Sequence, residues 1–138
     1  MDERDLALRN LVYRRFVELG RAPTRAELGD DSGLRRLHDA HALVLDERSG
    51  EIRMANPFSA VTTPFRVEAG GRSWHANCAW DAFGIPAALH VGGHVATTCP
   101  DCGEAIEVDV GAGRPAPLEL VFHVVVPARR WWDDIVFT

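Results

Sequence analysis

The sequence contains no lysine, and its 15 basic residues are all arginines, set against 20 acidic residues. The formal net charge of -5 gives no general attraction for a polyanion, so the composition argues against nucleic acid as a partner. No apolar run reaches the ~20 residues that a membrane-spanning helix needs, and the first residues lack the pattern of a signal peptide. We therefore expect a cytoplasmic protein that makes no contact with a membrane.

Cysteine is also scarce, because only Cys78, Cys99 and Cys102 are present. An odd number of cysteines without an export signal does not suit a disulfide framework, so reduced thiols or metal ligands explain them better. With 138 residues, of which 46% are hydrophobic, the chain has the size and composition of an ordinary globular domain. The three thiols are therefore the first residues that require a chemical explanation.

The N-terminal part is predicted to form three helices followed by a hairpin. Apolar residues recur at three- and four-residue steps over residues 6–19, which is typical of an amphipathic helix. Thr24 and Glu27 form a capping box that begins a short second helix, and a third helix with its own apolar face follows. Segments 42–46 and 51–55 then have the pattern of two strands around a polar tip.

This order of elements is that of a winged helix, so we predict a winged-helix-like N-terminal region over residues 1–55. DNA binding would be the obvious function of such a region. However, residues 1–54 hold 11 acidic residues and 10 arginines, and phosphate contacts dominate the affinity for DNA. A helical part that packs on the rest of the protein is the favoured interpretation.

From residue 56 onward the sequence changes to short strands separated by turns that contain glycine and proline. A short helix is expected over residues 78–83, ended by Gly84 and Pro86. The predicted fold class is α+β, with the winged-helix-like helical part packed on a small mixed, mostly antiparallel sheet. The predicted strands are 65–68, 72–75, 94–98, 105–109 and 118–126, and the last, as the longest apolar run, is expected to be central.

Cys78 and Asp81 form the first candidate site, because residues three apart on a helix share one face. A helix N-terminus is expected to lower the pKa of the Cys78 thiol, which would make it a better nucleophile and metal ligand. Poor solvation among aromatic side chains is expected to raise the pKa of Asp81, so that it can donate a proton. The alternative is a buried structural cysteine beside a capping aspartate. The residues expected to line the pocket are Trp74, His75, Trp80, Phe83, Trp131 and Trp132.

The run Cys99-Pro-Asp-Cys102-Gly103 is a C-x-x-C knuckle, which is half of a zinc ribbon. Structural Zn(II) needs two further ligands, and Cys78 with one histidine could supply them only if the chain folds back on itself. The alternative is a tight turn without a metal. Cys78, Cys99 and Cys102 are thus the candidate metal ligands.

Four stretches of the chain resemble the alkylmercury (organomercurial) lyase family, in particular its lyase-like bacterial branch. They are residues 58–67, residues 74–86 with Cys78-Ala-Trp-Asp81, the knuckle at 99–103, and residues 127–138. The resemblance implies an alkylmercury lyase-like core over residues 56–138. In such lyases two cysteines and one aspartate cleave a carbon–mercury bond: the thiolates bind the metal and the carboxyl delivers a proton to carbon.

The first cysteine and the aspartate of this family carry over onto Cys78 and Asp81, whereas Cys99 matches a cysteine that is usually structural. The second catalytic cysteine of the family would follow beyond Thr138, so the core is short at its C-terminal side relative to that pattern. Either Cys99 or Cys102 replaces that thiol, or the core is a shortened one, or the protein has another task.

The predicted function is protonolytic cleavage of carbon–mercury bonds with thiolate capture of the metal, and we expect this chain alone to cleave slowly or not at all. The alternatives are a non-catalytic protein that binds soft metals or organometals, and a winged-helix regulator that senses a thiophilic ligand. No cofactor is expected to be required. Hg(II) would be the bound product, and Zn(II) could occupy the cysteines. Expected partners are a small organometallic or other thiophilic ligand, external thiols and a metal-accepting reductase.

Overall fold

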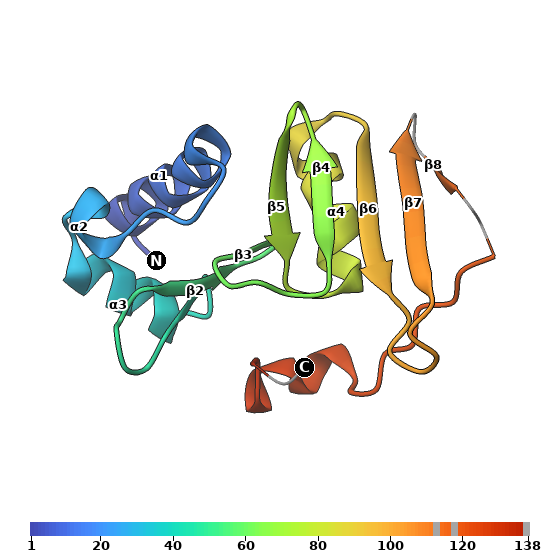
Figure 1. Ribbon diagram of the computed structural model, residues 1–138. Coiled ribbons are helices and arrows are strands. Elements are labelled where there is room, and N and C mark those ends of the chain that lie inside the picture. Colours follow the sequence, from blue (N-terminus) through green and yellow to red (C-terminus); the bar gives the residue numbers. More distant parts are fainter. Residues whose placement is uncertain (112–113, 117–118, 137–138) are drawn as a thin grey trace.

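The computed structural model describes residues 1–111, 114–116 and 119–136 (Figure 1). Within these residues the chain forms three N-terminal helices, an antiparallel sheet, one helix packed on the sheet and a C-terminal 3-10 turn, which confirms the α+β class. The helical elements are α1 (Glu3–Leu19), α2 (Arg25–Leu28), α3 (Asp31–Asp39), α4 (Ala79–Leu89) and η1 (Ala128–Asp133). The strands are β1 (Val44–Leu45), β2 (Ile52–Ala55), β3 (Phe58–Ser59), β4 (Arg66–Ala69), β5 (Arg72–Ala76), β6 (Gly93–Thr98), β7 (Ala105–Gly111) and β8 (Arg114–Ala116).

The N-terminal helices begin and end where local chemistry dictates. Asp2 and Asp5 form a capping box at the start of α1, and Gly20 ends that helix in the left-handed conformation. The capping box predicted at Thr24 and Glu27 begins α2. The three helices and the β1–β2 hairpin expected for this region are therefore all present, while the assignment as a winged helix stays a prediction.

The strand order across the sheet is β1-β2-β3-β5-β4-β6-β7-β8, and each neighbouring pair of described strands is antiparallel. The expected parallel component of a mixed sheet is therefore not found in the described residues. The helical connection through α4 does join two strands of equal direction, β5 and β6, but β4 lies between them. Because β2 also pairs with β3, the N-terminal hairpin and the later strands belong to one sheet.

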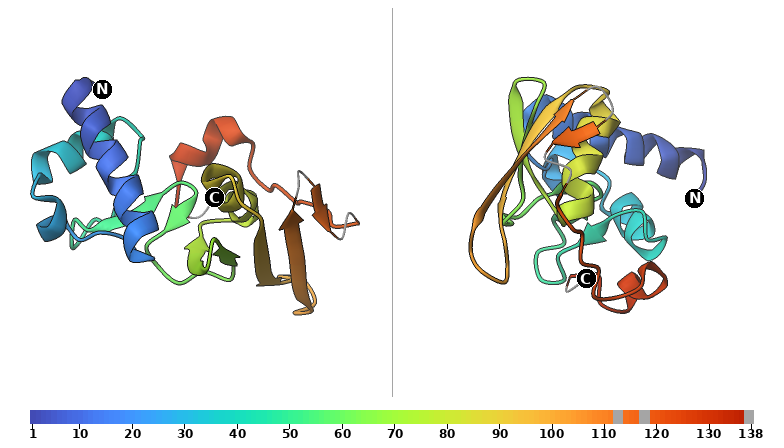
Figure 2. Two further views of the ribbon diagram at one scale, coloured as in Figure 1. Left: turned by 90° about the horizontal axis from the view of Figure 1, so that it is seen from above. Right: turned by 90° about the vertical axis from the view of Figure 1, so that its right-hand side faces the viewer.

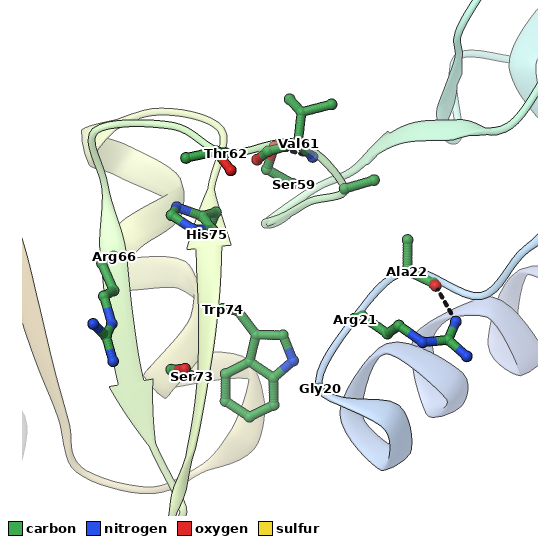
Figure 3. Close-up of a pocket in the computed structure, with 11 residues that line it drawn as sticks. Gly20, Arg21, Ala22, Ser59, Val61, Thr62, Arg66, Ser73, Trp74 and His75 are labelled. Atoms are coloured by element: carbon green, nitrogen blue, oxygen red, sulfur yellow. Dashed lines mark hydrogen bonds between the residues drawn. The ribbon is translucent and has the colours of Figure 1, made fainter. Parts of the chain in front are cut away.

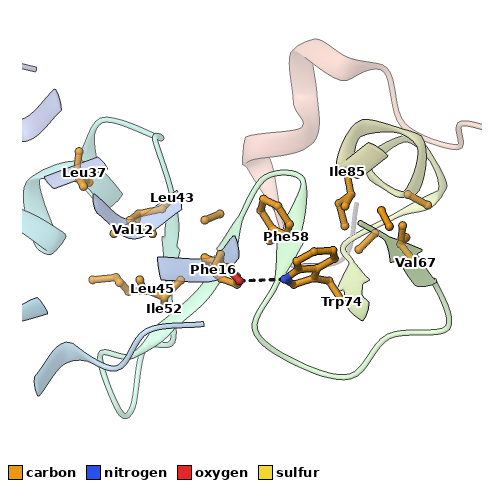
Figure 4. Packing of buried hydrophobic residues seen from close by; sticks show 14 of the residues in the cluster. Val12, Phe16, Leu37, Leu43, Leu45, Ile52, Phe58, Val67, Trp74 and Ile85 are labelled. Carbon is orange, nitrogen blue, oxygen red and sulfur yellow. Dashed lines mark hydrogen bonds between the residues drawn. The ribbon is translucent and has the colours of Figure 1, made fainter. Parts of the chain in front are cut away.

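One hydrophobic cluster extends from the N-terminal helices to β7 (Figure 4). Phe16 of α1 stacks on Phe58 of β3, and the indole Nε1 of Trp74 donates a hydrogen bond of 3.0 Å to the carbonyl oxygen of Phe16. Figure 2 shows α4 against one face of the sheet, where Val67 and Ile85 are fully buried. This continuous core fixes the start of α4 relative to the N-terminal helices.

Two sequence expectations about helix and strand bounds are wrong. Helix α4 continues through Gly84 and Pro86 to Leu89, because the proline packs in the core. Glycine at position 84 allows a close approach to Pro57, since a Cβ there would lie only 3.1 Å from its side chain. Residue 118 of the expected central strand lies outside the described residues, and residues 119–126 form no strand. The short strand β8 already pairs with β7 at that edge of the sheet.

The C-terminal segment instead contacts both α4 and the N-terminal part. The ring of Phe122 lies 5.3 Å from that of Phe83 on α4, measured between centroids. On η1, Trp132 stacks on His41 with a centroid distance of 4.0 Å. Figure 2 shows this segment passing beside α4. Among the described residues, no helix is both long and apolar enough to cross a membrane.

Candidate functional site

The backbone places Cys78 and Asp81 together at the start of α4. Strand β5 ends at Ala76, and Cys78 is the N-cap residue of α4, with extended backbone angles of φ -150° and ψ 179°. Its carbonyl oxygen accepts the first helical hydrogen bond, from the Ala82 N–H at 3.0 Å. Asp81 lies in the first helical turn, where its carboxylate is close enough to the Cys78 thiol for each group to affect the pKa of the other. The expected thiol–carboxyl pair is therefore formed.

Burial raises the pKa of the Cys78 thiol above its ordinary value, because removal from water disfavours the thiolate. The backbone N–H groups of Asp81 and Trp80 point at the sulfur and lower the pKa, as expected at a helix N-terminus, but their effect is the smaller one. The nearby charge of Asp81 raises the pKa further. The expectation of a lowered thiol pKa is thus wrong, and the resting group is a neutral thiol.

Burial also raises the pKa of the Asp81 carboxyl, as the sequence predicted. Hydrogen bonds from the side chains of Asn77 and Cys78 oppose this shift without cancelling it. A half-buried carboxylate with a raised pKa accepts a proton more readily than an exposed one. Asp81 can therefore store the proton that its neighbouring thiol gives up.

Asn77 positions the carboxylate and was missed from the sequence. Its Nδ2 lies 3.0 Å from the Asp81 Oδ2, 3.0 Å from the Asn56 Oδ1 and 3.2 Å from the carbonyl oxygen of Phe58. The Tyr13 hydroxyl donates a hydrogen bond of 2.9 Å to the Asn56 carbonyl oxygen and so ties α1 to the same turn. Asp81 is only four residues from Asn77, but the contacts with Asn56 and Phe58 join segments far apart in the sequence, so no local pattern could have indicated them.

Two of the expected pocket residues contribute to a different cavity. Trp74 and His75 line a cavity of about 160 Å³ between the end of α1 and the strands β3 and β5 (Figure 3). Its other lining residues include Arg21, Ser59 and Arg66, and neither Cys78 nor Asp81 belongs to the lining. Trp74 is 5% exposed and serves the core, whereas His75 lies within hydrogen-bonding distance of the Thr63 backbone.

The remaining expected pocket residues divide between α4 and the C-terminal turn. Trp80 lies beside Cys78 in the sequence but is 71% exposed, and Phe83 packs against Phe122. Trp131 donates a hydrogen bond of 2.7 Å to the carbonyl oxygen of Val126, while Trp132 stacks on His41. The structure therefore brings Trp80 and Phe83 onto the helix of the thiol–carboxyl pair and does not gather all six residues around it.

Cys99 and Cys102 lie in the turn between β6 and β7. Hydrogen bonds from the backbone N–H groups of Cys102 and Asp101 lower the pKa of the Cys99 thiol, and the Cys102 side chain contributes a further one. Within the described residues, no group of three or more histidine, cysteine or acidic side chains could hold a metal ion. Cys99 and Cys102 therefore do not join Cys78 and Asp81 in one metal site.

The comparisons with known proteins agree with the resemblance noted in the sequence. A family model described as alkylmercury lyase matches residues 58–138. A solved structure described as the mercury-bound form of MerB2 is similar, with 22% sequence identity and a TM-score of 0.65. The match covers 85% of this chain and 62% of that chain, so this chain spans less than two thirds of the length of MerB2. No curated protein sequence matches this chain.

Proposed function

The chain belongs to the alkylmercury lyase family, and on that premise we propose that Cys78 and Asp81 act together on a carbon–mercury bond. Cys78 is the mercury ligand and Asp81 carries the proton. The observation that supports this most directly is that the half-buried Cys78 thiol, at the N-cap of α4, lies beside the half-buried Asp81 carboxylate in the first turn of that helix. The mercury bound in the MerB2 structure, which shares the fold, agrees with a mercury-related role.

The first step is capture of the organomercurial. The Cys78 sulfur displaces a halide or thiolate from R–Hg–X, a new sulfur–mercury bond forms, and X⁻ leaves. The thiol proton moves to the neighbouring Asp81 carboxylate. The pair thus passes from thiol and carboxylate to bound metal and carboxylic acid, and the raised pKa of Asp81 favours its holding of that proton.

The second step breaks the carbon–mercury bond. A second thiolate binds the metal and weakens that bond, and Asp81 gives its proton to the departing carbon as the bonding electron pair leaves mercury. The products are the hydrocarbon R–H and Hg(II) held between Cys78 and the second sulfur. Since no third cysteine, histidine or acidic group among the described residues joins the pair as a metal site, the second thiolate comes from a small external thiol.

A non-catalytic organometal-binding protein is the second candidate. It is favoured because no second thiol lies beside Cys78 among the described residues. Without a second thiol beside Cys78, capture of R–Hg⁺ requires fewer groups than its cleavage does. The two candidates differ in whether hydrocarbon is released. Release of hydrocarbon is therefore what the experiment measures.

The test uses phenylmercury with an excess of a monothiol, and gas chromatography measures the benzene released. Cys78→Ser should release no benzene above the level of thiol alone, although Cys99 and Cys102 still offer thiols that can bind phenylmercury. Asp81→Asn should capture phenylmercury but lose benzene release, because an amide has no proton of comparable acidity to give.

The controls are Cys102→Ser, which changes an exposed thiol, and Asp109→Asn, which changes a carboxylate 81% exposed on β7. Both should release benzene at the rate of the unmodified protein. If the unmodified protein captures phenylmercury but releases no benzene, it binds organomercurials without cleaving them. Unchanged benzene release by Cys78→Ser would refute the site itself.

A further inference from the structure

The turn between β6 and β7 carries two cysteines that the proposed reaction at Cys78 does not use. Thr98 and Ala105 form the last pair of this hairpin, so residues 99–104 make up its loop. The Cys99 N–H donates a hydrogen bond of 2.8 Å to the Glu104 carbonyl oxygen, and the Gly103 N–H donates one of 2.9 Å to the Cys99 carbonyl oxygen. These bonds close a compact knuckle with a cysteine at either end of its C-x-x-C segment.

The knuckle brings its two cysteine side chains together. The side chain of Cys102 and the backbone N–H groups of Asp101 and Cys102 all lie close enough to the Cys99 sulfur to interact with it. Gly103 has a φ of 74°, the left-handed conformation that lets the chain turn back after Cys102. Cys102 is exposed and Cys99 is half-buried, so both thiols can be reached from solvent.

The ligand count at this turn decides which metal it suits. Structural Zn(II) requires four ligands in a tetrahedron, and among the described residues no third histidine, cysteine or acidic group completes such a set. A soft cation that forms a stable complex with two thiolates needs no further ligand. Two thiolates also neutralise a divalent cation completely, so the complex needs no counter-charge from the protein.

We propose that Cys99 and Cys102 alone form a two-coordinate site for a soft cation of the Hg(II) type, separate from the site at Cys78. Binding is a thiol exchange, in which Hg(SR)₂ reacts with the two protein thiols to give Hg(S-Cys)₂ and two molecules of RSH. Two sulfur–mercury bonds form, two break, each proton passes from a protein thiol to a released thiolate, and nothing is oxidised or reduced. This inference holds whether or not Cys78 and Asp81 cleave organomercurials.

The knuckle gains its advantage from holding two thiols in one short segment. Once one sulfur has bound the metal, the second is present at an effective concentration of the order of millimolar or higher. A small monothiol at lower concentration cannot displace the pair, whereas it can displace mercury from a single protein thiol. Retention of mercury against a competing monothiol is therefore the property that distinguishes the knuckle from Cys78.

The experiment uses the full chain, reduced and kept under inert gas, in the unmodified form and as Cys78→Ser, Cys99→Ser and Cys102→Ser. Hg(II) is added as its complex with 2-mercaptoethanol, with free 2-mercaptoethanol in excess but below millimolar. After desalting, mercury per chain is counted by mass spectrometry, and X-ray absorption gives the number of sulfur atoms on the metal. Circular dichroism checks that each variant is folded.

Cys78→Ser should retain about one mercury per chain with two sulfur ligands, because the knuckle is intact, whereas Cys99→Ser and Cys102→Ser should each lose most of it. Loss of retained mercury in Cys78→Ser would overturn the proposal, as would retention in Cys102→Ser, whose changed residue is exposed and whose folding is least at risk. Zn(II) alone, added to the unmodified protein, should not survive desalting. A stable dimer with zinc on four sulfur atoms would replace the two-coordinate site with a shared tetrahedral one.

Discussion

Removing the Asn77 amide should loosen the start of α4 and the carboxylate that it positions. The Nδ2 group has two hydrogens for three acceptors, namely the Asp81 Oδ2 and Asn56 Oδ1, both at 3.0 Å, and the Phe58 carbonyl oxygen at 3.2 Å. It therefore makes two hydrogen bonds at a time. Since each bond contributes about 1 kcal/mol and the acceptors are partly buried, Asn77→Ala should lower the free energy of unfolding by about 2 kcal/mol.

Urea unfolding followed by circular dichroism measures this loss as a lower midpoint with an unchanged slope. Asn10→Ala is the matched control, because Asn10 is exposed on α1 and alanine is a good helix former, so its stability should change by less than about 0.5 kcal/mol. If Asn77→Ala also lost less than about 0.5 kcal/mol, the amide would not hold the carboxylate as described. Slower benzene release in Asn77→Ala with normal phenylmercury capture would support its positioning role.

Three further predictions concern charge, reactivity and packing. Because burial raises the folded-state pKa of Asp81 above its ordinary 3.8, the wild-type protein should lose stability relative to Asp81→Asn as the pH rises from about 3.8 through that raised value, as pH-dependent unfolding would show. Iodoacetamide at neutral pH should label Cys99 before Cys78. Backbone N–H groups lower the pKa of Cys99, whereas burial raises the pKa of Cys78. Peptide mapping gives the order of labelling, and labelling of Cys78 first would contradict this prediction. Trp74→Phe should cost about 1–2 kcal/mol in urea unfolding, because the carbonyl oxygen of Phe16 loses a buried indole donor, whereas Trp80→Phe at an exposed position should cost almost nothing.

The elements that the sequence predicts correctly are those set by local chemistry. The capping box at Thr24 and Glu27 and the turn at Gly70–Gly71 between β4 and β5 are short-range signals, and both features are present. The prediction that Pro86 ends the helix is wrong, because burial of this proline in the core outweighs its poor helix propensity. This is a tertiary effect that no local pattern contains. Residues 118–126 misled because an apolar run forms a strand only where a neighbouring strand edge is free to pair with it.

The candidate site likewise combines features that the local sequence determines with features that only the fold shows. The pairing of Cys78 with Asp81 follows from a three-residue spacing on one helix, so the sequence contains it. The pKa of the thiol depends on how deeply α4 packs, and only the folded structure shows that burial outweighs the helix N-terminus. Asn77 meets Asn56 and Phe58 through strand pairing between distant segments, which one sequence cannot reveal.

The intact-protein mass spectrum after reaction with one equivalent each of phenylmercury and a small thiol tests most directly whether Cys78 holds the metal while Asp81 supplies the proton. With Cys99 and Cys102 changed to serine, so that Cys78 is the one remaining thiol, we predict that the protein carries mercury without the phenyl group and that its Asp81→Asn form carries intact phenylmercury. Loss of the phenyl group from that Asp81→Asn form at the rate of the protein that keeps Asp81, or the absence of a mercury adduct on Cys78, would contradict the account.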